Sequence, residues 1–222
     1  RSSIARHGNV VLRATRPAVA ESSRMMFSVV IPTYNRRALL ERCLASVRAQ
    51  TFEDYEIVVV DDGSTDGTVE MLNDLGSGRL KIIVQDNAGP GAARNRGVAA
   101  ASGRYLAFLD SDDFWFPWTL FAYVQAIEQC GNPAFIAGTP YLFEQEDSAF
   151  SVPRGDFQVL QFADYLESGD EWRWVGAGNI VISRTALVNV GCFMEENVNA
   201  EDADLVLKLG VLKGFVQVTA PY

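Results

Sequence analysis

The sequence predicts an α/β fold in which a mostly parallel, Rossmann-like sheet is covered by helices on both faces. Apolar runs of strand length alternate with segments whose apolar residues recur at helical spacing. These runs are almost continuously apolar, as strands are when both faces of a parallel sheet are buried. Because such sheets bind ligands at the carboxyl ends of their strands, we expect a site at that edge.

The first half of the chain supplies the clearest elements. Strands are expected within residues 26–35, 55–68, 80–86 and 104–113, where apolar runs end in Pro32 or in polar residues. Helices are expected within residues 36–51, 68–76 and 89–103. The first of these helices has apolar residues every three or four positions, the second ends at Gly76, and the third follows a Gly-rich entry.

The pattern is looser after residue 113. Helices are expected within residues 117–131, 157–168 and 200–214. Strands are expected within residues 133–143 and 215–222, a polar loop over 144–156, and a strand followed by a short helix over 179–193.

The composition argues against several classes of protein. The formal net charge is −9, which disfavours nucleic acid as a partner because nucleic-acid-binding surfaces are basic. His7 is the sole histidine, so histidine catalysis and zinc binding are nearly excluded. Cys43, Cys130 and Cys192 form no C-x-x-C pair, which indicates reduced thiols and a cytoplasmic protein. The sequence contains no run of 18 apolar residues, so it predicts no membrane-spanning helix. We therefore expect at most peripheral association with the inner face of the membrane.

Acidic side chains follow the strand within residues 104–113. The stretch "LDSDD" places Asp110, Asp112 and Asp113 directly after an apolar run, where unpaired carboxylates are costly. Mg²⁺ and Mn²⁺ prefer oxygen ligands, and Mg²⁺ is commonly held by one or two carboxylates together with substrate phosphates. The motif therefore suits a metal–diphosphate complex. An acidic turn that caps the next helix explains it equally well when it is taken alone.

A second acidic pair ends the strand within residues 55–68. In "VVVDDGSTDGT", Asp61 and Asp62 follow an apolar run. A carboxylate accepts hydrogen bonds from a base N–H or a ribose hydroxyl, which favours a nucleoside as the guest. The alternative is a capping role, in which Ser64 or Thr65 caps the next helix after a turn at Gly63.

The stretch "NAGPGAARNRG" begins a helix with features of an anion site. Gly89 and Gly91 let the backbone approach a ligand closely, and Arg94 and Arg96 stand near a helix start whose dipole favours anions. The alternative is a tight turn with solvated arginines. The stretch fits neither a Walker A loop nor the pattern G-x-G-x-x-G.

Two further groups of residues have functional and structural interpretations. "NAEDADL" places Glu201, Asp202 and Asp204 in the first turn of a helix, where a carboxylate can act as a general base or can merely complement the helix dipole. The aromatic stretches "FWFPW" and "EWRW" contain Trp115 and Trp174, which can wall a sugar pocket or belong to the core.

Together, in this order and at this spacing, the motifs resemble those of family 2 glycosyltransferases, which have the GT-A fold. The carriers are "SVVIPTYNR", "VVVDDGSTDGT", "GPGAARNRG", "YLAFLDSDD" and "AEDADL". The resemblance implies a leader or extension over residues 1–24 and a catalytic domain over residues 25–222. It also implies a metal-dependent enzyme that moves a sugar from a nucleotide diphosphosugar, commonly a UDP-sugar, to an acceptor hydroxyl with inversion.

The resemblance implies a role for each candidate residue. Asp202 would be the catalytic base, and Glu201, Trp115 and Trp174 would contact the acceptor. Asp112, together with Asp110, would hold Mg²⁺ or Mn²⁺. The donor would contact Pro32, Thr33, Tyr34, Arg36, Asp61, Asp62, Arg94, Asp110, Ser111 and Asp112. The acceptor would be a glycan or a lipid-linked molecule, in the synthesis of a polysaccharide or glycolipid.

Departures from the family pattern leave two alternatives. Many relatives continue past "FVQV" with an Arg and a His near the site, whereas this sequence ends at Tyr222, so either the domain is truncated there or those two groups are missing. A nucleotide-sugar-binding or degenerate domain of a larger protein is the alternative without catalysis. A nucleotidyltransferase is the nearest rival enzyme, but "PTYNRR" lacks the glycines that its first loop needs.

Overall fold

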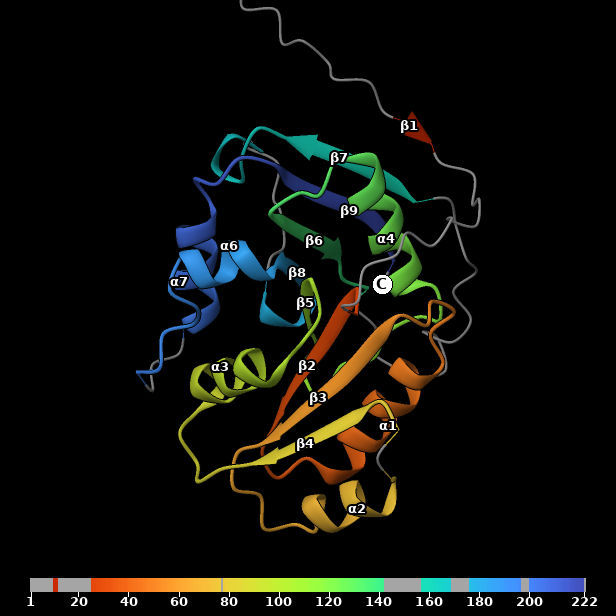
Figure 1. The fold of residues 1–222 in the computed structure, drawn as a ribbon, viewed down its shortest axis with the longest axis vertical. Helices are drawn as coiled ribbons and strands as arrows, with labels where there is room; N and C mark the ends of the chain where they lie inside the picture. The colour runs from red at the N-terminus through yellow and green to blue at the C-terminus, as the bar shows by residue number, and fades with distance from the viewer. Residues whose placement is uncertain are drawn as a thin grey trace, which may run out of the picture.

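The computed structural model describes residues 10–11, 25–76, 78–141, 157–168, 176–196 and 200–221. In this part of the chain the strands form one nine-stranded sheet in the order β1-β7-β9-β6-β8-β5-β2-β3-β4 (Figure 1). Within the predicted leader, the described element is β1 (Val10–Val11), which pairs antiparallel with β7 (Gln158–Phe162). The predicted α/β fold is confirmed, and the sheet joins a parallel half to a mixed half.

The parallel half of the sheet carries the loops of the predicted site. Its strands are β2 (Phe27–Thr33), β3 (Tyr55–Asp61), β4 (Leu80–Val84) and β5 (Tyr105–Phe108). β2 pairs parallel with both β3 and β5, and β4 pairs parallel with β3. The register sets Thr33 beside Asp61 at the last rung of β2 and β3. The carboxyl ends of these strands therefore meet at one edge, as the sequence predicts.

The other half of the sheet is mixed. β8 (Ile180–Ser183) runs antiparallel between β5 and β6 (Phe135–Thr139). β9 (Phe215–Pro221) pairs parallel with β6 and antiparallel with β7. The short 3-10 helix η2 (Ala177–Asn179) leads into β8.

The predicted helix in residues 157–168 is wrong. Residues 158–162 form strand β7, and only Leu166–Ser168 form a 3-10 helix, η1. Phe157 and Val159 are buried on one side of the strand, and its backbone pairs with β9. Backbone pairing with β9 therefore determines the structure of this short segment, whose apolar spacing is ambiguous between helix and strand.

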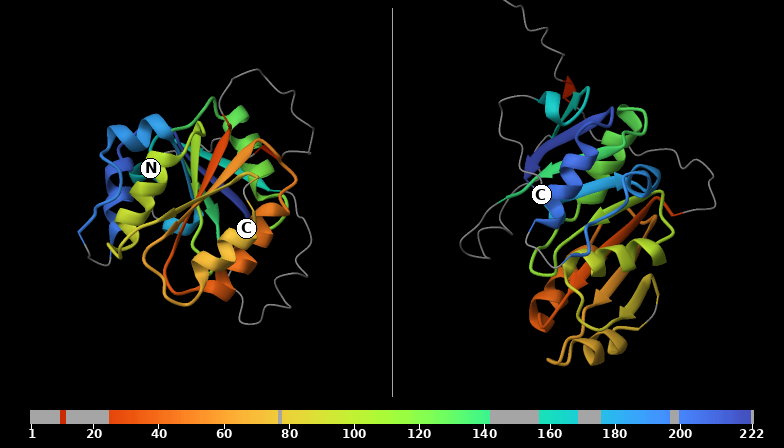
Figure 2. Two further views of the ribbon diagram at one scale, coloured as in Figure 1. Left: turned by 60° about the horizontal axis from the view of Figure 1, so that its bottom comes forward. Right: turned by 90° about the vertical axis from the view of Figure 1, so that its left-hand side faces the viewer.

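Helices cover both faces of the sheet, as Figures 1 and 2 show. One face carries α1 (Arg37–Arg48), α2 (Thr68–Asp74) and α4 (Thr119–Gln129), and the other carries α3 (Pro90–Ala100), α6 (Arg184–Asn189) and α7 (Glu201–Leu209). Val29 and Ile31 of β2 belong to the apolar cluster under the first group, whereas Val30 belongs to the cluster under the second. This division follows from the alternation of side chains along a strand.

Helix α3 packs on the sheet through a glycine. A Cβ atom at Gly97 would lie 2.5 Å from Cγ1 of Val30, so a larger residue would push the helix away. This close contact holds α3 against β2 and brings Arg94, one turn earlier, to the carboxyl edge of the sheet.

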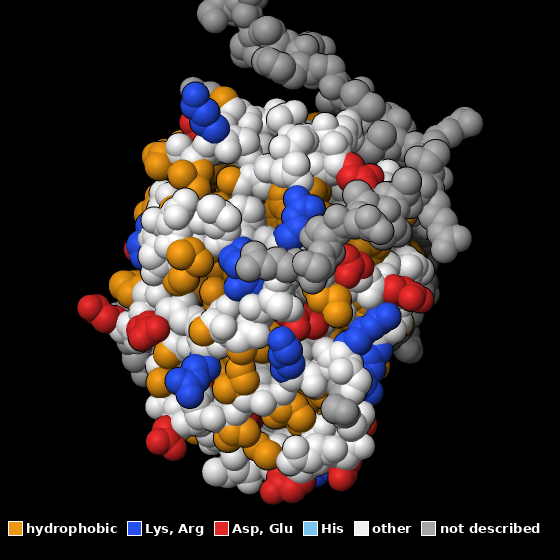
Figure 3. Space-filling model, in the orientation of Figure 1, with side chains coloured by type: hydrophobic (Ala, Val, Ile, Leu, Met, Phe, Trp, Pro, Cys, Tyr) orange, Lys and Arg blue, Asp and Glu red, His pale blue; other side chains and the backbone are white. Residues whose placement is uncertain are grey.

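No helix in the described ranges is both long enough and apolar enough to cross a membrane. On the face drawn in Figure 3, acidic and basic side chains are both spread over the surface, with apolar side chains between them.

Candidate active site

The predicted residues converge on one cleft at the carboxyl edge of the parallel strands. The cleft has a volume of about 550 Å³. Its lining comes from the loops after β2, β3, β4 and β5 and from the starts of α3 and α7, and comprises Pro32, Thr33, Tyr34, Arg36, Asp62, Asn87, Gly89, Pro90, Ala93, Arg94, Asp110, Ser111, Asp112 and Glu201. Ten of these fourteen residues are candidates from the sequence, so motifs that lie far apart in the chain form one site.

Arg94 is the electrostatic centre of the cleft. Its Nη2 atom lies 2.7 Å from Oδ1 of Asp110, and its Nη1 atom lies 2.7 Å from Oε1 of Glu201. Its guanidinium group also lies over the ring of Phe193, at 5.4 Å from the centroid. The Arg94 side chain is 6% exposed, so both ion pairs are partly shielded from water.

The pairing with Arg94 sets the ionisation of Glu201. Burial opposes ionisation of Glu201, but hydrogen bonds from backbone N–H groups and from Arg94 outweigh it and lower the pKa below its ordinary value. Glu201 is therefore a charged partner of Arg94 and a weaker proton acceptor than an unpaired carboxylate.

The two carboxylates of "DDGS" have different surroundings. Asp62 is 4% exposed, and it accepts hydrogen bonds from Nε2 of Gln85 at 2.7 Å and from the backbone N–H groups of residues 88 and 89 at 2.9 Å. Asp62 thus holds the loop that leads into α3. Asp61 is fully buried and accepts from the backbone of Ser64 at 3.0 Å, while its Oδ1 atom has no partner among the described residues. Asp61 lines a neighbouring hollow instead of the cleft itself.

The loops after β2 and β3 are fastened to each other. The backbone N–H of Asn35 donates to Oγ of Ser64 at 2.8 Å, and the Asn35 side chain accepts from the backbone N–H of Thr65 at 2.8 Å. The backbone N–H of Arg37 donates to Asp66 at 2.9 Å. Ser64 and Thr65 therefore join two loops and do not cap α2, contrary to the capping alternative read from the sequence.

The three acids of "DSDD" also differ. Asp112 stands at the mouth of the cleft, where its Oδ2 atom lies 2.7 Å from Nη1 of Arg36 and both side chains are about half exposed. Asp113 has a pKa raised to about 6, because its carboxyl group is partly withdrawn from water and lies close to the charges of Asp110 and Asp112. A Cβ atom at Gly178 would lie 2.9 Å from Oδ2 of Asp113 and 3.0 Å from Oδ2 of Asp110, so glycine makes room for both carboxylates.

Three candidates from the sequence lie elsewhere. Asp202 starts α7 beside Glu201 but does not line the cleft, and its Oδ1 atom accepts from the backbone N–H of Ala203 at 2.7 Å. Trp115 is 5% exposed and packs in the apolar core under α1 and α4. The core alternative therefore holds for Trp115, because little of its surface is left for an acceptor. Trp174 lies outside the described residues.

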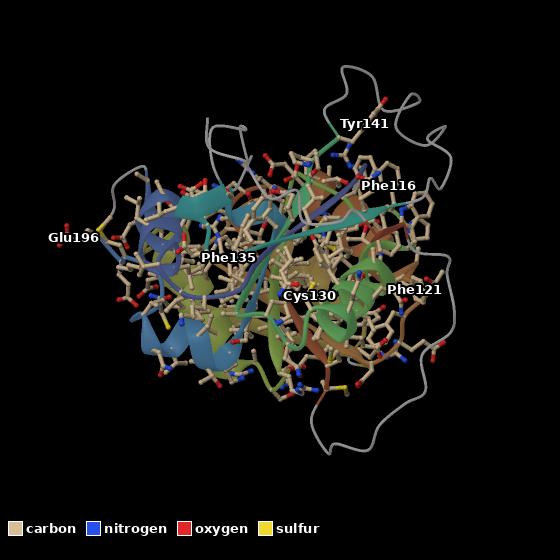
Figure 4. All side chains as sticks on the ribbon, turned by 90° about the horizontal axis from the view of Figure 1, so that it is seen from above. Phe116, Phe121, Cys130, Phe135, Tyr141 and Glu196 are labelled. Carbon is tan, nitrogen blue, oxygen red and sulfur yellow. The ribbon has the colours of Figure 1, made fainter. Side chains whose placement is uncertain are left out.

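Aromatic residues beside Trp115 do form a cluster near the surface. The rings of Phe116 and Trp118 are stacked with centroids 5.0 Å apart. Tyr141 meets Phe116 edge to face, with the ring centroids 6.5 Å apart, and both residues are labelled in Figure 4. These contacts come from the loop before α4 and from the residues that follow β6.

The family model described as "Glycosyl transferase family 2" matches residues 28–187. The chain belongs to glycosyl transferase family 2. The putative glycosyltransferase EpsH of Bacillus subtilis (strain 168) is 40% identical over 136 residues, which are 60% of this chain and 39% of EpsH. The poly(ribitol-phosphate) beta-glucosyltransferase of Bacillus spizizenii is 43% identical over 96 residues, which are 40% of this chain and 15% of that protein.

Solved structures of TarS share the fold. The crystal structure of TarS 1-349 from S. aureus matches with a TM-score of 0.73 and 26% identity, over 89% of this chain and 60% of TarS. TarS in complex with UDP-GlcNAc matches with a TM-score of 0.68 and 25% identity, over 89% of this chain and 59% of TarS. The chain thus spans less than two thirds of each of these relatives, and the GT-A fold class predicted from the sequence is confirmed.

Sequence reasoning missed several residues of this family 2 cleft. Asn87, Pro90 and Ala93 line it from the turn into α3 and from the start of that helix, and Gly178 approaches its carboxylates from η2. Gly89 also lines the cleft, and the sequence had indicated it for close ligand approach. Gly178 carries no local signal, because its role depends on contacts with residues more than sixty positions earlier.

Proposed function

We propose that this domain is an inverting glycosyltransferase that moves a sugar from a nucleotide diphosphosugar to an acceptor hydroxyl. The single observation that carries the proposal is that one cleft brings together Pro32–Tyr34, Arg94 and the Asp-x-Asp motif that follows β5. The TarS relative, solved in complex with UDP-GlcNAc, supports a UDP-sugar as the donor. The poly(ribitol-phosphate) in the name of the Bacillus spizizenii relative supports a role in polysaccharide or glycolipid synthesis.

The nucleoside end of the donor fits between the loops after β2 and β3. Pro32, Thr33 and the half-exposed Tyr34 form one wall of the cleft, and Asp62 stands opposite. A ribose hydroxyl or a base N–H would meet an oxygen acceptor in the carboxylate of Asp110, which also lines the cleft. Arg94 pairs with both Asp110 and Glu201, so a single positive charge faces two carboxylates where the donor binds.

The carboxylates of Asp112 and Asp110 suit Mg²⁺ or Mn²⁺. The donor set consists of oxygen atoms, which both cations prefer. Asp112 is half exposed and lines the cleft. Asp110 pairs with Arg94 through Oδ1, so its Oδ2 atom takes no part in that ion pair. When bound, such a cation would offset the charge that develops on the leaving diphosphate.

Acceptor activation is assigned to Asp202. Glu201 is a poor base because Arg94 and backbone N–H groups lower its pKa. Asp202 follows it on α7, and within the described part of the chain no cation pairs with Asp202. Its carboxylate would take the proton of the acceptor hydroxyl as that oxygen attacks the anomeric carbon from the face opposite the diphosphate. Direct displacement inverts the anomeric centre and needs no covalent enzyme intermediate.

A binding panel followed by a transfer assay tests the proposal. UDP-, GDP-, dTDP- and CDP-sugars, each with and without Mn²⁺, are expected to include one that raises the melting temperature, since a ligand of the native state stabilises it by mass action. Asp202→Asn should keep that binding and lose about 10²- to 10⁴-fold in transfer rate. No binding by any nucleotide sugar would refute the proposal. Binding by the wild type without hydrolysis or transfer would indicate a binding domain.

A further inference from the structure

We propose that Arg36 is a switching counter-ion of the donor site. It pairs with Asp112, as the structure shows, and exchanges this partner for the donor's diphosphate when Asp112 ligates a metal ion. The inference rests on the proposed function and assigns a role to a residue that the sequence placed only in the donor pocket.

The contact itself is that of an exchangeable pair. Nη1 of Arg36 lies 2.7 Å from Oδ2 of Asp112, and the two side chains are 46% and 44% exposed. Both residues line the cleft. Exposed ion pairs of this kind contribute little to stability and are readily replaced by another charged partner.

The other arginine of the cleft cannot make this exchange as easily. Of the two arginines in the described lining, Arg94 is 6% exposed and is held by both Asp110 and Glu201. Turning its guanidinium group to a phosphate would leave two carboxylates in the cleft without a cation. Arg36 gives up one half-exposed partner, and that carboxylate is the predicted metal ligand.

The backbone holds Arg36 over the cleft while its side chain can still turn. Asn35, with a φ of 51°, is fastened to Ser64 and Thr65, and the backbone N–H of Arg37 is fastened to Asp66. Arg36 lies between these two anchors and precedes α1. The loop contacts therefore fix the position of the Arg36 Cα atom, whereas rotation of its long side chain can bring the guanidinium group to Asp112 or to a ligand.

The charge balance of the cleft requires a cation for the donor. Asp62, Asp110, Asp112 and Glu201 line it together with the two arginines, so acids outnumber bases. A diphosphate adds further negative charge next to Asp112. A metal ion on Asp112 and a guanidinium group released from it would both face the phosphates, and Arg forms strong charge-assisted bonds with phosphate.

The test compares Arg36→Gln with Arg37→Gln, which removes the same charge at the next position, outside the cleft lining. Mn²⁺ binding is measured by electron paramagnetic resonance without nucleotide. Binding of a free nucleoside diphosphate, the one that corresponds to the best-binding nucleotide sugar of the panel, is measured by calorimetry with saturating Mn²⁺. Arg36→Gln should bind Mn²⁺ about two- to fivefold more tightly, because the competing cation is gone. It should bind the diphosphate about tenfold more weakly.

Arg37→Gln should change neither affinity, and Arg36→Lys should restore most of both wild-type affinities by restoring the charge. Equal affinities in Arg36→Gln and Arg37→Gln would overturn the inference while leaving the proposed function intact. Weaker diphosphate binding with unchanged Mn²⁺ binding would also overturn it, since Arg36 would then be a plain phosphate contact. Tighter Mn²⁺ binding with unchanged diphosphate binding would reduce Arg36 to a competitor and refute the exchange. Failure of the wild type to bind any diphosphate would instead refute the proposed function.

Discussion

Replacing Arg94 with glutamine removes the guanidinium group that joins α3 to the loop after β5 and to α7. The variant leaves Glu201, whose side chain is 13% exposed, and Asp110, whose side chain is 33% exposed, without their shared cation. Breaking a buried ion pair by removing one partner costs about 3–5 kcal/mol, because a charge is left without compensation. Asp110 still reaches water, so we expect a loss of about 3–4 kcal/mol in the free energy of unfolding.

Urea denaturation at pH 7 measures this loss, with Arg96→Gln as the matched control on the same helix. Arg96 is exposed, and its substitution should change stability by less than about 0.5 kcal/mol. The deficit of Arg94→Gln should shrink as the pH falls, because Glu201 can then take up a proton and lose its charge. Equal stability of the two variants at pH 7 would refute the view that Arg94 compensates two shielded carboxylates.

Three further outcomes are expected. The pKa of Glu56 is lowered to about 2, because hydrogen bonds from Lys81, Ser28 and Ser102 outweigh the effect of its burial. The ionised Glu56 therefore stabilises the folded state fully above the ordinary pKa of 4.5, and this contribution is lost as the pH falls towards 2. Glu56→Gln should therefore flatten the stability profile between pH 4.5 and 2, which denaturation curves at several pH values would check. Gly97→Ala should cost at least about 1–3 kcal/mol in thermal or urea unfolding, because its Cβ would meet Val30 at 2.5 Å; a neutral result would contradict that contact. Asp112→Asn should weaken nucleotide binding with Mn²⁺ present and leave it nearly unchanged with chelator, whereas equal losses in calorimetry would assign Asp112 a structural role.

The parallel half of the fold was predictable because each of its strands is an apolar run with a distinct polar end. Parallel pairing then places the carboxyl ends of these strands at one edge, where the structure sets Thr33 beside Asp61. Strand β7 was not predictable, since its pairing with β9 joins residues more than fifty positions apart and its short apolar pattern also fits a helix. Long-range pairing overrides local pattern in such segments.

The sequence predicted which residues lie in the candidate site better than it predicted what each of them contacts. Asp61 and Asp62 look alike in sequence, but their surroundings differ. Asp62 accepts three hydrogen bonds from the loop before α3, whereas Oδ1 of Asp61 is buried without a partner among the described residues. Trp115 directly follows a run of site residues, but the chain turns into the core there. These differences depend on side-chain direction and burial, which the spacing of residues does not contain.

The bridge between Arg94 and Glu201 spans 107 positions of the chain. At a synthesis rate of roughly 5–20 residues per second, the arginine leaves the ribosome about 5–20 s before its glutamate partner. During that interval the parallel strands and α3 can already pack, but the cleft lacks the wall supplied by α7. Completion of the donor site is therefore tied to the arrival of α7, and an N-terminal fragment that ends before α7 would lack both this wall of the cleft and β9, which lies between β7 and β6 in the sheet.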